Sequence, residues 1–204
     1  MAICQFIQKG KLTLDSKLKD CLSIVFPDFH QNVTIHHLLT HTSDIPDYFD
    51  EEVMNDFEQI WQKKPMCHME NSKDFLPMFQ DEVIMFEPGE RFHYNNVGYI
   101  LLGLIVEELT GNKFSEYIVN NIFRPCEMKD SGYFSMDQLP ENTALGYIDE
   151  ENGAWRTNVY FLLIKGGADG GAYIPHLLQM KAWVHTILLA RLRNNCKQME
   201  PFRS

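Results

Sequence analysis

The sequence predicts an α+β protein in which helices outnumber strands. Two apolar segments, residues 97–109 and 114–123, repeat Leu, Ile, Val and Phe at helical spacing. Residues 133–173 instead carry short apolar patches between glycines and asparagines, a pattern typical of loops and short strands. With 45% hydrophobic and 12% aromatic residues, the chain of 204 residues can bury a core. No linker-like shift in composition and no internal repeat divides it, so a single domain over residues 1–204 is expected.

Two short helices are expected in the amino-terminal part of the chain. An apolar run over residues 1–7 is followed by Gly10, and glycine commonly closes a helix in the left-handed conformation. Thr34 is a suitable N-cap for a helix over residues 35–40. The turn-forming residues 42–47 should end that helix.

The two longer helices are expected in the middle of the sequence. Residues 97–109 follow Asn95 and Asn96, either of which can cap a helix, and a Thr-Gly pair comes directly after them. Because this segment is apolar nearly all round, the helix should be buried. Residues 114–123 place aromatic and aliphatic side chains on one face, and Pro125 ends the pattern.

The aromatic- and methionine-rich region over residues 48–86 is less regular. Phe57, Ile60 and Trp61 recur at helical spacing, whereas two prolines interrupt the pattern. The region is therefore expected to be loosely helical. A last helix is expected over residues 177–192.

Charge and cysteine content exclude some classes of function. The formal net charge of -10 argues against a nucleic-acid partner, because such binding needs clustered Lys and Arg. No stretch approaches the ~20 apolar residues that span a membrane. The five cysteines are scattered without a Cys-x-x-Cys pair, so they are interpreted as reduced thiols, which favours the cytoplasm for this chain.

Two amino-terminal motifs carry a family resemblance. Residues 10–15 read GKLTLD, and residues 33–43 read VTIHHLLTHTS. These runs resemble motifs of the serine β-lactamase and penicillin-binding protein family, in its class C and esterase-like branch. Asp44 stands where that family usually has glycine. Because Asp tolerates left-handed backbone better than most residues, the turn is expected to survive the change.

The most specific resemblance lies in residues 86–111, FEPGERFHYNNVGYILLGLIVEELTG. They are similar to the Tyr-x-Asn box of the family and the helix that follows it. The resemblance implies that Tyr94 is catalytic, transferring protons with a pKa that nearby cations lower. It implies that Asn96 binds substrate by a hydrogen bond to the substrate amide. Residues 166–173 resemble the glycine-rich stretch of the same family.

The resemblance spans residues 1–173 and is weak over residues 174–204, so the domain is expected to be truncated. It implies a fold like that of the DD-peptidases, represented mainly by the helical lobe with little of the antiparallel sheet. In this family a Ser-x-x-Lys serine forms an acyl-enzyme, and a Lys/His-Thr/Ser-Gly box lines the site. These two motifs would lie upstream of Met1 and beyond Ser204, so the chain as it stands should be inactive.

Two local matches to those motifs are interpreted as accidental. Ser16 and Lys19 have the Ser-x-x-Lys spacing, but they follow a polar turn instead of opening an apolar helix. Lys165 precedes two glycines but lacks the hydroxyl residue of the third box, and it comes before the glycine-rich stretch instead of after it. Neither lysine is therefore assigned a catalytic role.

The resemblance implies a serine hydrolase that cleaves a β-lactam, a D-amino peptide or an ester, without a metal or other cofactor. Pocket shape would decide among these substrates, because all three reactions use the same acyl-transfer groups. The alternative is an inactive binding module, or pseudoenzyme, that self-associates through exposed apolar faces. Relatives that act on cell-wall peptides are exported, so a full-length parent could be exported too.

A zinc hydrolase is a third hypothesis. His37 and His41 lie four residues apart, as zinc ligands do in His-Glu-x-x-His proteases. Leu38 occupies the position at which that motif needs its glutamate. The spacing alone therefore gives zinc little support.

Overall fold

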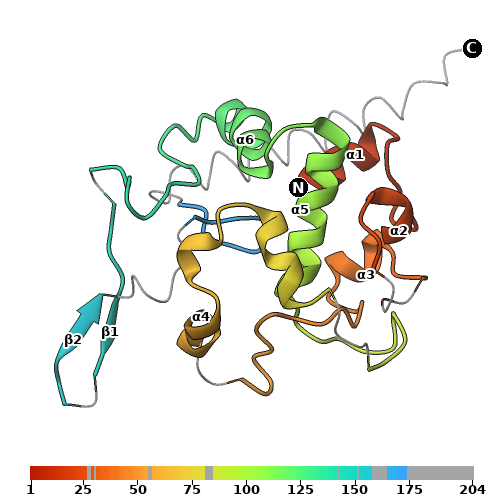
Figure 1. Ribbon diagram of the computed structural model, residues 1–204. Coiled ribbons are helices and arrows are strands. Elements are labelled where there is room, and N and C mark those ends of the chain that lie inside the picture. The colour runs from red at the N-terminus through yellow and green to blue at the C-terminus, as the bar shows by residue number, and fades with distance from the viewer. Residues whose placement is uncertain are drawn as a thin grey trace, which may run out of the picture.

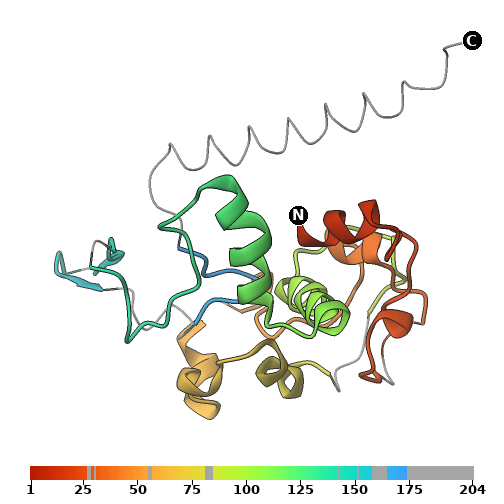
Figure 2. The same cartoon turned by 90° about the horizontal axis from the view of Figure 1, so that it is seen from above.

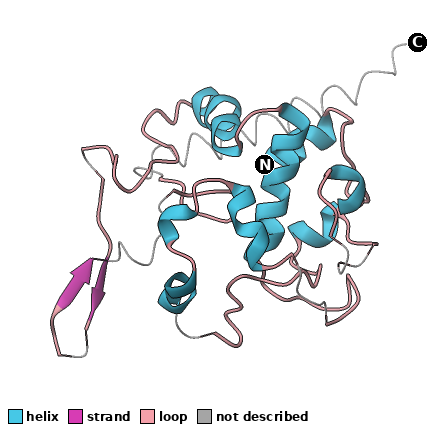
Figure 3. Ribbon diagram, viewed as in Figure 1, coloured by secondary structure: helices cyan, strands magenta, loops and turns pink. Residues whose placement is uncertain are grey.

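The structure is a computed structural model, and it describes residues 1–26, 29, 31–54, 57–80, 85–141, 143–150, 152–157 and 165–173. Helices predominate in this part of the chain, as Figure 3 shows. The strands β1 (Tyr147–Asp149) and β2 (Trp155–Thr157) pair antiparallel as a hairpin that projects from the helical body (Figure 1). The predicted α+β composition with few strands is confirmed.

The helix α5 (Asn96–Thr110) forms the centre of the molecule. The side chain of Asn95 caps it by accepting a hydrogen bond from the Gly98 amide, and Gly111 closes it with a φ of 67°. The prediction of a capped and buried helix is thus confirmed. Figures 1 and 2 place α1 and α6 over one side of α5 and the segment around α4 on the other. The buried residues of α5 are Val97, Gly98, Ile100, Leu101, Leu102, Gly103, Leu104, Ile105 and Val106.

The amino-terminal helices follow their predicted signals. The first, α1 (Ala2–Gln8), is followed by Gly10 with a φ of 68°. The short helix α2 (Leu18–Cys21) comes next, and α3 (Ile35–Leu39) begins after Thr34, whose hydroxyl accepts from the His37 amide. Asp44 adopts a φ of 54°, so the expected left-handed turn is confirmed.

The region after residue 48 consists of short helical turns. They are η1 (Phe57–Gln59), α4 (Ile60–Lys63), η2 (Met66–His68) and η3 (Ser72–Met78). An aromatic contact joins the first two of these turns, with ring centroids of Phe57 and Trp61 5.4 Å apart. The region is therefore helical in short pieces, as the broken spacing predicts.

The second long helix changes its winding part of the way along. It starts as α6 (Phe114–Ile118), widens into the π-helical turn η4 (Val119–Phe123) and ends in the 3-10 turn η5 (Arg124–Cys126). Residues 114–123 are thus helical as predicted, and Pro125 lies in the closing turn. The predicted helix over residues 177–192 lies outside the described residues.

The glycine-rich residues 165–173 return to the central helix. A Cβ atom added to Gly103 of α5 would lie 2.5 Å from the Cβ of Ala168, so only glycine allows this approach. The loop also pairs with residue 132, because Gly132 and Tyr173 exchange backbone hydrogen bonds. Within the described part of the chain, every helix is too short or too polar to cross a membrane.

Candidate active site

The two predicted site residues, Tyr94 and Asn96, lie on either side of the residue that caps α5. Asn95 is buried; its side-chain oxygen accepts from the Gly98 amide at 2.7 Å, and its Nδ2 donates to the Ile45 carbonyl. Tyr94 is 45% exposed, and its hydroxyl donates to the Oδ1 atom of Asn96 at 3.4 Å. The anchored cap thus brings both predicted side chains together at the open amino end of the helix.

Asp47 fixes the orientation of Asn96. Its Oδ2 atom accepts the backbone N–H of Asn96 at 2.5 Å and the side-chain N–H at 3.1 Å. Its Oδ1 atom accepts from the Phe49 amide at 3.2 Å. Burial raises the pKa of Asp47 to about 6, although these three hydrogen bonds act in the opposite direction. An asparagine amide has two N–H groups, and this arrangement uses one of them.

A pocket of about 420 Å³ opens beside Asn96. Inside it, the Tyr48 hydroxyl donates to the Asp169 carboxylate at 2.9 Å. Burial raises the pKa of Asp169, and burial together with Asp169 raises the pKa of Tyr48. The pocket therefore combines aromatic walls with acidic groups. Its lining consists of Tyr48, Phe49, Glu51, Phe57, Asn96, Gly166, Asp169, Gly170, Gly171, Ala172 and Tyr173.

The charges around Tyr94 differ from those that the resemblance implies. Burial raises the pKa of Tyr94, and the carboxylates of Glu51, Asp47 and Asp169 raise it further. Among the described residues the charges that act on the phenol are negative. The expected lowering by cations needs partners from elsewhere in the fold and stays a prediction. Tyr94 is a neutral phenol at pH 7 and can donate a proton or a hydrogen bond.

The two histidines of the zinc hypothesis are engaged in local structure. The Nδ1 atom of His37 accepts from the Thr34 amide at 3.3 Å, which completes the cap of α3. The Nδ1 atom of His41 accepts from the Asn95 amide at 3.2 Å. Nowhere in the described ranges do three His, Cys, Asp or Glu side chains gather as a metal site. The two histidines therefore stabilise two different turns.

Of the two accidental motif matches, the Ser16 and Lys19 pair lies at α2, whereas Lys165 adjoins the pocket beside Asn96. Ser16 accepts a hydrogen bond from the Thr13 amide at 2.9 Å, in the turn before α2. Lys19 belongs to α2 itself. Lys165 forms an isolated bridge with Ser135 and lines a small cavity that shares Gly166 and Asp169 with that pocket. No contact recorded for the described residues joins Ser16 to Tyr94 or Asn96.

Sequence reasoning missed three groups of this site. Asp47 lies in a run of turn-forming residues and gives no sign of contact with Asn96, 49 positions away. Tyr48 and Asp169 are 121 positions apart, so their hydrogen bond has no local signal. Only the unusual placing of an acidic residue within the glycine-rich stretch could have drawn attention to Asp169.

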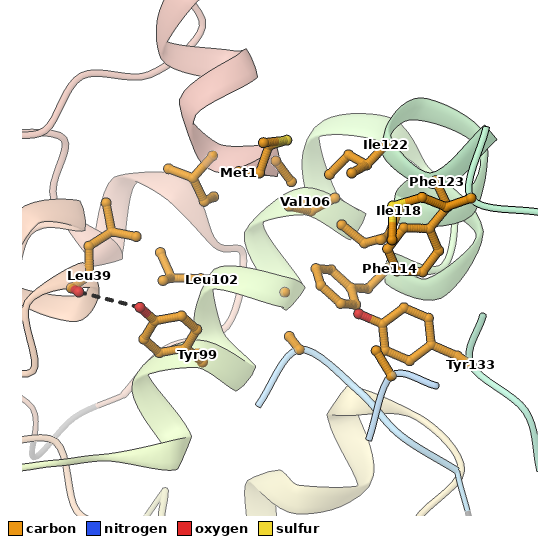
Figure 4. A pocket seen from close by; sticks show the side chains of 16 residues that line it. Met1, Leu39, Tyr99, Leu102, Val106, Phe114, Ile118, Ile122, Phe123 and Tyr133 are labelled. Atoms are coloured by element: carbon orange, nitrogen blue, oxygen red, sulfur yellow. Dashed lines mark hydrogen bonds between the residues drawn. The ribbon is translucent and has the colours of Figure 1, made fainter. Parts of the chain in front are cut away.

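A second, apolar groove of about 360 Å³ lies between the start of α1, one face of α5 and α6 (Figure 4). Figure 4 shows Met1, Leu102, Val106 and Phe114 around it. Its polar groups are mainly tyrosine hydroxyls, and the Tyr99 hydroxyl donates to the Leu39 carbonyl at 3.4 Å. The full lining is Met1, Ala2, Ile3, Leu39, Tyr99, Leu102, Gly103, Val106, Phe114, Ile118, Ile122, Phe123, Met128, Tyr133, Ala168 and Ala172.

Comparison with known proteins identifies relatives that share this fold. A family profile described as Beta-lactamase matches residues 1–193. Penicillin-binding protein 4* of Bacillus subtilis is 33% identical over 147 residues, which are 69% of this chain and 30% of that protein. The crystal structure of a penicillin-binding protein from Bacillus halodurans is 53% identical with a TM-score of 0.85, covering 92% of this chain and 56% of that one. The D-amino acid amidase of Ochrobactrum anthropi shares the fold at a TM-score of 0.70 and 23% identity, over 93% of this chain and 52% of that one.

These similarities define a protein with the fold of the β-lactamases and penicillin-binding proteins, whose described residues are rich in helices and form a small two-stranded antiparallel sheet. The motif-based resemblance is thereby confirmed. The chain belongs to the Beta-lactamase family. It spans 56% of the solved penicillin-binding protein and 30% of the curated one.

Proposed function

We propose that this chain is the helical part of a serine hydrolase of the β-lactamase and penicillin-binding type. The substrate would be a β-lactam, a D-amino peptide or an ester, cleaved through an acyl-serine intermediate. The observation that supports this most is the Tyr94 and Asn96 pair, held by Asp47 beside a pocket of about 420 Å³. The name of the amidase from Ochrobactrum anthropi adds support for a D-amino substrate.

The roles of the two site residues follow from their surroundings. Asn96 presents an amide whose orientation Asp47 fixes, which suits a hydrogen bond to a substrate carbonyl or amide. Tyr94 would return a proton to the leaving group, since its phenol is neutral. To act as a base it would need a cation, such as a lysine of the Ser-x-x-Lys motif. We propose that the nucleophile and this lysine are absent from residues 1–204, and that the chain alone forms no acyl-enzyme.

Covalent labelling tests this function. The chain of 204 residues is treated with a fluorescent penicillin and with a fluorophosphonate, and its intact mass is measured. No adduct is expected. An adduct on any serine, located by peptide mass spectrometry, would contradict the proposal that the nucleophile is absent.

A chimera tests the roles of Tyr94 and Asn96. Residues 1–173 replace the matching part of the Bacillus halodurans penicillin-binding protein, to which the chain is 53% identical. The chimera should form the penicillin adduct. Tyr94→Phe should slow acylation about 100-fold or more, as loss of a proton-transfer group does. Exposed Tyr147→Phe, in the distant hairpin, is the matched control and should label normally. A chimera that folds but labels equally well with Tyr94→Phe would contradict the role of Tyr94.

A binding module that self-associates is a second candidate function. The apolar groove of about 360 Å³ favours it, because exposed apolar surface of this kind commonly marks a contact site. Two copies would shield their grooves from water in a dimer. We propose this contact for the chain in its present length.

Sedimentation velocity over a range of concentrations tests self-association. A dimer should form in the unmodified chain and dissociate in Leu39→Glu, which places a charge at the groove. Val25→Glu is the control, because Val25 is 83% exposed and lies outside the groove. A chain that stays monomeric at the highest concentration would contradict this second function.

A further inference from the structure

His41 contacts the segment that carries Tyr94 through both its backbone and its side chain. Its carbonyl accepts from the His93 amide at 2.8 Å, and its Nδ1 accepts from the Asn95 amide at 3.2 Å. The two bonds therefore hold the residues on either side of Tyr94. His41 reaches them because its backbone is left-handed, with a φ of 54°, a conformation that residues other than glycine seldom adopt.

The imidazole ring of His41 also forms the surface on which Tyr94 lies. The ring centroids are 4.8 Å apart and the planes meet at 29°, a stacked arrangement. Tyr99 of α5 stacks on the same imidazole at 5.1 Å, and Phe92 meets it edge-on at 5.8 Å. Among the ring contacts of the described residues, Tyr94 takes part in the His41 contact alone. His41 is thus the aromatic neighbour that orients this exposed ring.

We propose that His41 is a positioning residue that holds Tyr94 and Asn96 in place for acyl transfer. This inference rests on the proposed function, because it assigns His41 a purpose within that site. The Nδ1 bond fixes Asn95, and through it the start of α5 on which Asn96 lies. The stacked ring fixes the phenol itself. Without the imidazole, the Tyr94 ring would lose this stack and keep its 3.4 Å hydrogen bond to Asn96.

The hydrogen bond from the Asn95 amide requires that His41 hold Tyr94 and Asn96 in its neutral form. An acceptor Nδ1 carries no hydrogen, so the neutral ring holds its proton on Nε2. A protonated imidazole would direct a second N–H at the amide of Asn95, and the bond would be lost. Burial lowers the pKa of His41 below its ordinary 6.5, so the neutral form prevails at pH 7.

Acid is therefore expected to release the Tyr94 segment. The titratable groups against the His41 ring are the phenols of Tyr94 and Tyr99. The Asp47 carboxylate, whose pKa burial raises to about 6, acts on the same Tyr94 phenol. The neighbouring imidazole that must be distinguished is that of His93. Its Nε2 atom lies 3.4 Å from Asp50 and 3.7 Å from Glu52.

NMR of the 204-residue chain with 13C-labelled tyrosine tests the proposal, with Tyr94→Phe assigning the signal. His41→Asn keeps a side-chain acceptor and tolerates left-handed backbone but lacks the ring. His41→Phe keeps a stacked ring but lacks the acceptor. His36→Asn, at an exposed position of α3, is the matched control and should change neither signal.

His41→Asn and His41→Phe should distinguish the effect of the ring stack from that of the hydrogen bond to the Asn95 amide. His41→Asn should move the Tyr94 ring signal and lower the phenol pKa towards 10, because the ring that buries Tyr94 is gone. His41→Phe should keep the ring signal and speed hydrogen exchange of the Asn95 amide about fivefold. In the unmodified chain the Tyr94 signal should move as the pH falls below 6.5, and in His41→Phe only the part of this response that protonation of Asp47 causes should remain.

An unchanged Tyr94 signal in His41→Asn, or an acid response in His41→Phe as large as in the unmodified chain, overturns the proposal. If neither variant folds by circular dichroism, His93→Gln decides through the Asn95 amide, which bonds directly to His41: loss of its exchange protection in acid supports His41, and protection that persists overturns the proposal. These measurements need no hydrolysis. A chimera that fails to label would therefore contradict the proposed function without affecting the NMR evidence that His41 positions Tyr94.

Discussion

The two sides of the Tyr94 site are held in different ways. On one side, the start of α5 is fixed by neighbours in sequence, since the Asn95 cap accepts from Gly98 only three residues on. On the other side, Tyr48 and Asp169 meet across 121 positions through one hydrogen bond. A short-range cap therefore starts the helix that carries Asn96, whereas long-range contacts place the acidic groups and, through Asp47 and His41, orient Asn96 and Tyr94.

The helical side therefore mainly sets the positions of the site residues, and the pocket side mainly sets the charge around them. The helical side carries Tyr94 and Asn96 with little charge of its own. The pocket side carries the carboxylates whose burial raises their pKa, and which raise the pKa of Tyr94 in turn. A change on the first side should therefore disturb the position of the site, whereas a change on the second should alter its titration.

The largest effect is expected where the two sides meet, at Gly103. Gly103→Ala would place a Cβ atom 2.5 Å from that of Ala168, so helix and glycine-rich loop would have to move apart. The free energy of unfolding should fall by about 3 kcal/mol, the upper end for an overpacked contact. Denaturant unfolding followed by circular dichroism measures it.

Gly98→Ala is the matched control in the same helix. A Cβ atom there would lie 3.6 Å from its nearest neighbours, an ordinary contact, so the gain in helix propensity should remain. The control should be neutral or more stable by up to about 1 kcal/mol. Equal losses in both variants would show that Gly103 has no special role in joining the two sides.

The second prediction concerns the cap on the helical side. Asn95→Ala removes the acceptor for Gly98 and the donor to the buried carbonyl of Ile45. The free energy of unfolding should fall by about 2 kcal/mol, from the lost cap and the unpaired carbonyl. Asn95→Asp keeps the cap but not the donor, so it should lose less. If Asp is as harmful as Ala, the donor to Ile45 is the dominant contact.

The helical side could be predicted from the sequence because its signals are local. Asn95, Gly111 and Thr34 each act within one turn of the helix that they begin or end. The Tyr94 and Asn96 pair could be found for the same reason, since both lie next to that cap. Asp44 kept the turn that usually carries glycine, because Asp tolerates its φ of 54°.

The acidic side could not be predicted because no short-range pattern encodes it. Asp47 and Asp169 come from two turns that only the folded chain brings to Tyr94. The cation expected near Tyr94 was implied by the family resemblance, and the described residues place carboxylates around this phenol. The left-handed His41, which stacks on Tyr94, likewise depends on contacts 54 positions away.

The smallest effect is expected on the acidic side, from Tyr48→Phe. The variant removes the 2.9 Å hydrogen bond to Asp169 and should cost about 1 kcal/mol at pH 7, with Tyr147→Phe on the exposed hairpin as control. The loss should shrink towards pH 4. The Tyr48 hydroxyl lowers the pKa of Asp169, which burial has raised, so removing it raises that pKa further.

The sign follows from proton linkage. A carboxyl whose folded pKa is raised binds protons more tightly in the folded state, so its contribution is favourable below the unfolded pKa of 3.8 and is lost as the pH rises through the folded pKa. In Tyr48→Phe the folded pKa of Asp169 is higher, so this loss of stability extends to higher pH and is larger at pH 7. Unfolding measured at pH 4 and pH 7 should therefore show the greater difference from the unmodified chain at pH 7. An equal difference at both pH values would mean that the hydroxyl acts on packing alone, and that the charge of the acidic side does not depend on this long-range bond.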